Sequence, residues 1–392
     1  MNPSATGWIK KLQQVISKEN SFLNFSKEQF YVALRCSGFI YGHNIKSIST
    51  SIKKTDLSDE EICKVNLFLA LKYIHHNTHS KRDLIESIID FYTEIDAHKT
   101  SIFQGLLGGK KSRLQLEKII HKRIQINDNI ITKNFNYFVI NALLFMDVLA
   151  YNQYLKTQHI SSNYIKNLEA AIEVISLDVL QSKVIKTEYD ESLIKLFISS
   201  RRYQNNAQIS YIQAIAFLNV YFEKQYILDI ACMATWGDKI IDKDEQQFLY
   251  QLGKDSKLEH DLVTQSIEAV NSFYTTNKDN IALLSSKNII KTFYDNSSKL
   301  VSKLINRNGK RLKKELIQSK DLMVLLSQST VRDLNNDEQK KVQEQLFDIF
   351  KSIPSLAIFI LPGGALLLPL FVKFIPKLLP SAFDDNRIED DN

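Results

Sequence analysis

The sequence predicts an all-α protein: a multi-helix body followed by a Pro-rich C-terminal helical segment of the membrane type. Three observations support this. Glycine (11) and proline (6) are scarce among 392 residues, so the turn-formers that an all-β chain needs are missing. No stretch alternates apolar and polar residues as strands do. Apolar residues make up 44% and charged residues 24%, which is ordinary globular usage.

The first region, residues 1–200, is expected to be a run of helices. Ser58 precedes three acidic residues, which is a helix start signal, and apolar residues follow it at helical spacing. A second apolar stripe covers residues 84–95. A third covers residues 135–151, and Asn136, Asn141 and Asp147 interrupt it, so it predicts a core helix rather than a membrane span.

No catalytic constellation stands out, so the sequence predicts a protein that is not an enzyme. The stretch Gly105–Ser112 has the wrong spacing for a phosphate-binding loop, because Lys110 stands where the second glycine belongs. His75 and His79 lack a third ligand and indicate a polar helix end. The basic run 110–123 favours a solvated helix face, so no DNA partner is expected. No small-molecule substrate is identified.

An acidic cluster marks the second region, residues 201–280. Asp238, Asp242 and Glu245 are spaced so that a helix–loop–helix would bring three carboxylates onto a divalent cation. The alternative is structural: Asp242 caps the next helix and Glu245 closes a capping box. This stretch resembles the TerB-like (tellurite-resistance) helical domain, whose acidic signature positions these residues match, with Lys239 where that family has glycine.

A basic stretch precedes the C-terminus. From Lys287 to Lys320 there are ten Lys/Arg and two acidic residues. This predicts a basic partner surface or a solvated helix face, and on anionic lipid each basic residue would contribute ~1 kcal/mol. The residues proposed for the surface are Lys303, Arg307, Lys310, Arg311, Lys313 and Lys314.

The apolar segment 353–383 predicts membrane contact. Ile353 to Val372 is free of charge, and as a helix it would span ~30 Å, the thickness of a bilayer core. Prolines and glycines interrupt it, which membrane helices tolerate better than soluble ones. A re-entrant pair of half-helices, or a hairpin buried in protein, remains an alternative. The residues that define the segment are Ile353, Pro354, Pro362, Gly363, Gly364, Pro369, Pro376 and Pro380.

Residues from about 299 to 384 resemble the LETM family, the leucine-zipper/EF-hand transmembrane proteins and their bacterial relatives. The resemblance rests on the order of a helix start at 334–338, residues 350–354, Pro362, residues 367–369, residues 373–376 and residues 379–383. The architecture is also similar to a bacterial group of LETM-related biofilm-associated proteins. Mitochondrial members carry an acid shortly after the proline matching Pro362, where this chain has Gly363 and Gly364.

The resemblance implies a non-catalytic membrane-associated protein, with the ribosome and membrane lipid as partners. It also implies a role in membrane-protein biogenesis or cation homeostasis. The predicted location is the cytoplasmic side of the bacterial inner membrane, with one C-terminal membrane segment in a LETM-like region, residues 281–392. The alternative function is a soluble TerB-like metal-binding or stress-response module with a buried C-terminus and a divalent cation at Asp238, Asp242 and Glu245.

Overall fold

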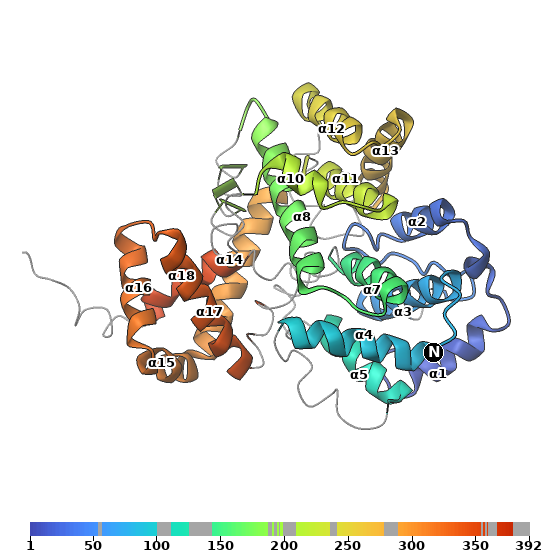
Figure 1. The fold of residues 1–392 in the computed structure, drawn as a ribbon, viewed down its shortest axis with the longest axis horizontal. Helices are drawn as coiled ribbons and strands as arrows, with labels where there is room; N and C mark the ends of the chain where they lie inside the picture. Colours follow the sequence, from blue (N-terminus) through green and yellow to red (C-terminus); the bar gives the residue numbers. More distant parts are fainter. Residues whose placement is uncertain are drawn as a thin grey trace, which may run out of the picture.

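The structure is a computed structural model, and it confirms the all-α prediction. It describes residues 1–53, 57–99, 111–124, 143–186, 190–191, 194–195, 197–198, 209–235, 241–277, 289–353, 356, 359 and 367–378. Within these ranges the regular structure is helical and there is no strand. Figure 1 shows the helices up to α13 (His260–Asn277) gathered on one side of the molecule. Helices α15 (Gly309–Gln318) to α18 (Leu368–Leu378) form a lobe on the other side, and α14 (Ile289–Arg307) reaches between them.

The described part of the chain before residue 200 is built of helices. They are α1 (Trp8–Ile16), η1 (Ser21–Asn24), α2 (Lys27–Cys36), α3 (Asp59–Asn77), α4 (Leu84–Lys99), α5 (Arg113–Ile124), α7 (Phe145–Thr157) and α8 (Ser162–Ser182) among the described residues. The start at Ser58 is confirmed, because its side chain accepts the N–H of Glu61 while Glu61 accepts the N–H of Ser58. Helix α3 is buried on nearly all sides, which its dense apolar sequence requires.

A buried ion pair joins α2 to the middle of the chain. The Arg35 guanidinium donates to both carboxylate oxygens of Asp229 on α11 (Tyr221–Thr235), at 3.0 and 2.9 Å, and to the Ser266 hydroxyl on α13 (His260–Asn277) at 3.0 Å. The Tyr31 hydroxyl also donates to Asp229, at 2.6 Å. Asp229 is fully buried. Burial raises the pKa of Asp229, and the Arg35 charge and the hydrogen bonds oppose that rise.

The described residues of the middle region form α10 (Tyr211–Ala216), α11 (Tyr221–Thr235), α12 (Lys243–Asp255) and α13 (His260–Asn277). Helix α11 packs against α8, α12 and α13. Helices α12 and α13 approach closely at Gly253, where an added Cβ would lie 2.3 Å from a methyl group of Val263. Because α8 packs against α10, α11 and α12, this bundle is continuous with the N-terminal region. The TerB-like resemblance and the domain boundaries stay predictions.

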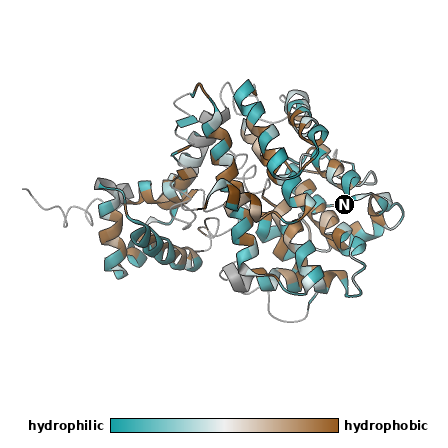
Figure 2. Cartoon of the chain, turned by 45° about the horizontal axis from the view of Figure 1, so that its top comes forward, coloured by the Kyte–Doolittle hydropathy of each residue, from teal (hydrophilic) through white to brown (hydrophobic). Residues whose placement is uncertain are grey.

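The C-terminal lobe contains the last five helices: α14 (Ile289–Arg307), α15 (Gly309–Gln318), α16 (Lys320–Val331), α17 (Asn336–Ser352) and α18 (Leu368–Leu378). Helix α18 packs against α14 and α16, and α16 also packs against α17. Figure 2 shows that the helices of this lobe are amphipathic, with apolar stripes beside polar ones. The lobe therefore has an apolar core of its own.

Candidate functional site

The order Asn336, Asp337, Glu338, Gln339 predicts a helix start with Asn336 as the cap, and helix α17 begins one residue earlier than that. The N-cap is Asn335, not Asn336: its side chain accepts the N–H of Glu338, and Glu338 accepts the N–H of Asn335. Both asparagines are competent caps, and Glu338 selects the one that lies three residues before it. The Arg332 guanidinium and the Asn335 N–H lower the pKa of Glu338 to about 2. Arg332 thereby ties the connection after α16 to the start of α17.

Three phenylalanines form the core between α17 and α18. Phe350 lies with its ring centroid 4.9 Å from Phe359 and 4.8 Å from Phe371, and Phe359 and Phe371 are 4.9 Å apart. All three side chains are fully buried. Edge-on and tilted aromatic contacts at this separation stabilise a core beyond the area they bury. This trio fixes α18 on the rest of the lobe.

The structure describes two parts of the predicted apolar segment, Ile353 with residues 356 and 359, and residues 367–378. Ile353 ends α17 and is buried, Pro369 lies in the first turn of α18, where a missing N–H costs little, and Pro376 lies near the end of that helix. The other residues of the prediction lie outside the described residues: Pro354, Pro362, Gly363, Gly364 and Pro380.

The described part of the apolar segment is packed in protein. Leu370, Phe371 and Ile375 of α18 are buried, and the helix is 11 residues long. Among the helices that the structure describes, none is both long enough and apolar enough to cross a bilayer. The packing of α18 matches the alternative of a segment buried in protein, and insertion of the whole segment 353–383 stays a prediction.

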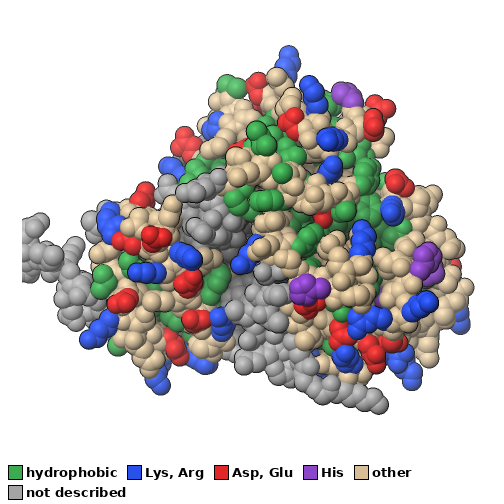
Figure 3. Space-filling model, viewed as in Figure 1, with side chains coloured by type: hydrophobic (Ala, Val, Ile, Leu, Met, Phe, Trp, Pro, Cys, Tyr) green, Lys and Arg blue, Asp and Glu red, His purple; other side chains and the backbone are tan. Residues whose placement is uncertain are grey.

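The predicted basic surface covers the end of α14 and most of α15. All six residues proposed for it are exposed: Lys303, Arg307, Lys310, Arg311, Lys313 and Lys314. The lower edge of the lobe, where Figure 1 places α15, carries several Lys and Arg side chains in Figure 3. Arg311 also donates to the carbonyl of Ser352 at 2.5 Å, which holds α15 against the end of α17.

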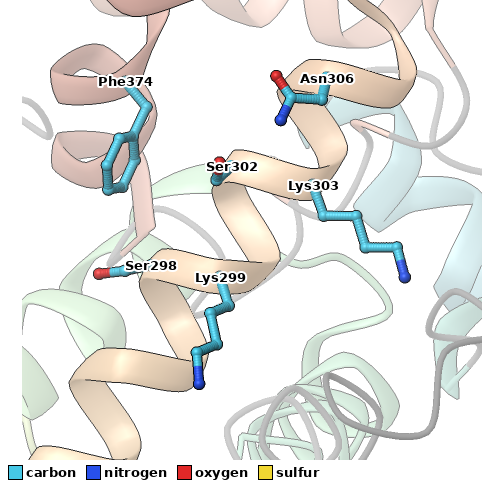
Figure 4. Close-up of a pocket in the computed structure, with 6 residues that line it drawn as sticks. All are labelled: Ser298, Lys299, Ser302, Lys303, Asn306 and Phe374. Atoms are coloured by element: carbon cyan, nitrogen blue, oxygen red, sulfur yellow. The ribbon is translucent and has the colours of Figure 1, made fainter.

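A shallow groove lies between α14 and α18. It is lined by Ser298, Lys299, Ser302, Lys303 and Asn306 of α14 and by Phe374 of α18. Ser298 and Ser302 turn toward Phe374, whereas Lys299 and Lys303 project away from it (Figure 4). The serines therefore line the inside of the groove, and the two lysines lie at its outer edge.

The acidic cluster of the middle region is only partly described. Asp242 is the N-cap of α12: its side chain accepts the N–H groups of Asp244 and Glu245, both at 2.8–2.9 Å, and Glu245 accepts the N–H of Asp242. This confirms the capping alternative. Such an N-cap contributes about 1 kcal/mol to the stability of the fold. Asp238 lies outside the described residues, and within them no group of metal-ligating side chains converges. Cation binding at Asp238, Asp242 and Glu245 stays a prediction.

Sequence reasoning missed two exposed aliphatic residues beside the basic surface. Ile317 of α15 and Val324 of α16 are 54% and 47% exposed. A helical projection of α15 would have found the first, because Leu312 and Leu316 define its buried side and Ile317 falls among the lysines.

Comparison with known proteins finds a similarity in the last part of the C-terminal lobe. Residues 334–392 match the family model described as "LETM1-like, RBD". A 52-residue stretch is 44% identical to the mitochondrial proton/calcium exchanger protein of Drosophila melanogaster, covering 13% of this chain and 5% of that relative. No solved structure matches the chain. The matches do not extend to the TerB-like or biofilm-associated resemblances. Residues 334–392, which contain α17 and α18, are therefore similar to the LETM family, and the chain spans only a small part of the relative that it matches.

Proposed function

We propose that this chain is a non-catalytic, membrane-associated interaction protein whose C-terminal lobe binds the ribosome. The observation that carries the proposal is the match of residues 334–392 to a LETM1-like RBD, with α17 and α18 folded together around the trio Phe350, Phe359 and Phe371. An ordered pair of helices presents a surface of fixed geometry, which reduces the entropy lost on binding.

The exposed face of α17 is the part of this lobe that we assign to the ribosome. Its inner face is apolar through Val342 and Leu346, whereas Lys340 and Lys341 are exposed on the outside. Exposed lysines contact nucleic-acid phosphates and release counterions, so such binding weakens with salt.

A role in membrane-protein biogenesis fits the residues better than cation transport. Ionisable residues inside a membrane segment mark the ion and proton pathways of pumps and transporters. This chain has Gly363 and Gly364 after Pro362, where the mitochondrial members of the family carry an acid. We place the protein at the cytoplasmic side of the bacterial inner membrane, with the segment 353–383 as the proposed membrane contact.

Ribosome binding is tested by co-sedimentation of the full chain with purified bacterial ribosomes. The chain is expected to pellet with ribosomes at low salt and to be released as salt rises. Replacing both α17 lysines, Lys340→Glu with Lys341→Glu, is expected to weaken binding about tenfold or more, because each contributes a phosphate contact.

The matched control is the pair Lys10→Glu and Lys11→Glu on α1, which makes the same charge change on the N-terminal region. It should leave sedimentation unchanged. A chain that stays in the supernatant at low salt would overturn the ribosome assignment. Equal loss of binding in the two double variants would also overturn the assignment to α17, because it would show that binding depends only on the net charge of the chain.

A further inference from the structure

The exposed face of α15 combines lysines with an aliphatic side chain. Lys310, Lys313 and Lys314 precede Ile317 by seven, four and three positions, which places all four on one face of the helix. All three lysines are exposed, and Ile317 is 54% exposed. The opposite face is fully buried through Leu312 and Leu316. Ile317 is therefore held outward by the packing of the helix.

The start of α16 repeats this arrangement. Val324 is 47% exposed and follows the exposed Lys320 by four positions, so the two side chains are neighbours on the helix surface, beside the exposed Asp321. Only Ser319 separates α15 from α16, and the two helices pack against each other. The corner between them thus carries two exposed aliphatic residues and a majority of basic charges.

We propose that this corner, the exposed faces of α15 and of the first turns of α16, docks on an anionic membrane surface. Lysine ammonium groups bind lipid phosphates, and branched aliphatic side chains enter the boundary between headgroups and acyl chains. This combination is typical of helices that lie in a membrane interface. The corner precedes the matched residues 334–392, so the family match does not assign it a partner.

The residue types favour lipid over RNA. Neither α15 nor α16 contains an aromatic residue on which a base could stack. An isoleucine side chain gains no free energy beside a phosphodiester backbone. In a lipid interface its apolar surface is removed from water, which is favourable. The proposal rests on the membrane-associated part of the proposed function and is independent of the ribosome part.

The test is flotation of the full chain with vesicles of phosphatidylcholine alone or with about a third phosphatidylglycerol. The wild-type chain is expected to bind the anionic vesicles about tenfold or more tightly than the neutral ones. Lys313→Glu with Lys314→Glu should lower binding to anionic vesicles by at least about tenfold. Ile317→Ser, which changes no charge, should lower it several-fold. The pair Lys10→Glu and Lys11→Glu serves as the control for net charge and should have no effect.

Three results would overturn the proposal. Equal binding to both kinds of vesicle would show that the membrane is reached without this corner. Unchanged binding of the α15 double variant would show the same. The third result is that the double variant loses binding, Ile317→Ser keeps it, and added RNA competes with the vesicles. That result would assign the corner to nucleic acid. Sedimentation of the double variant with ribosomes should be normal, so that failure of this proposal is distinguishable from failure of the ribosome assignment.

Discussion

Replacing Asp229 by alanine is expected to destabilise the folded chain by about 3–5 kcal/mol, because it leaves the buried Arg35 guanidinium without its counter-charge. The Tyr31 and Ser266 hydroxyls do not compensate a full charge. The ion pair links α2 with α11 and α13, so its loss should loosen the contact between the N-terminal and middle regions. Urea unfolding followed by far-UV circular dichroism measures the effect.

A double variant separates the cost of an uncompensated charge from the value of the pair. Arg35→Met with Asp229→Leu removes both charges and keeps apolar volume in the site. It is expected to cost less than Asp229→Ala alone, because no buried charge is left unpaired. If Asp229→Ala costs less than about 1 kcal/mol, Arg35 reaches water and the ion pair is not enclosed by protein.

Phe371→Ala is expected to destabilise the C-terminal lobe by about 3–5 kcal/mol, the usual cost of emptying a buried aromatic site. The ring is fully buried and contacts both Phe350 and Phe359. Since Phe371 joins α18 to Phe350 at the end of α17, amide hydrogens of α18 should exchange faster in the variant. Hydrogen exchange read by mass spectrometry checks this directly.

The control for that variant is Phe374→Ala, three residues along the same helix. Phe374 is half-buried and lines the groove with α14, so the same truncation should cost clearly less than at Phe371. Equal and small effects at both positions would mean that α18 does not pack on the lobe, and would favour an inserted segment.

Local signals in the sequence predicted the parts of the fold that depend on neighbouring residues. The caps at Ser58 and Asp242 are set by residues three positions away, so they are visible in the chain itself. The same rule placed the start of α17, with an error of one residue where two asparagines adjoin.

Long-range pairing could not be predicted in this way. Arg35 and Asp229 are 194 positions apart, and nothing near either of them indicates a partner. Hydropathy has a similar limit at α18, because a lipid core and a protein core favour the same apolar residues. Ile317 gives the opposite case: its residue type indicates burial, and only the position of the other α15 side chains places it outside.

The central claim, that the chain joins ribosomes to an anionic membrane, is tested most directly by flotation of ribosomes with phosphatidylglycerol vesicles. With the wild-type chain present, ribosomes should rise with the vesicles. They should stay at the bottom when no protein is added. They should also stay there with the α17 double variant (Lys340→Glu, Lys341→Glu) and with the α15 double variant (Lys313→Glu, Lys314→Glu), because joining ribosome to vesicle needs both surfaces. Ribosomes that stay at the bottom while the wild-type protein itself floats would contradict the account.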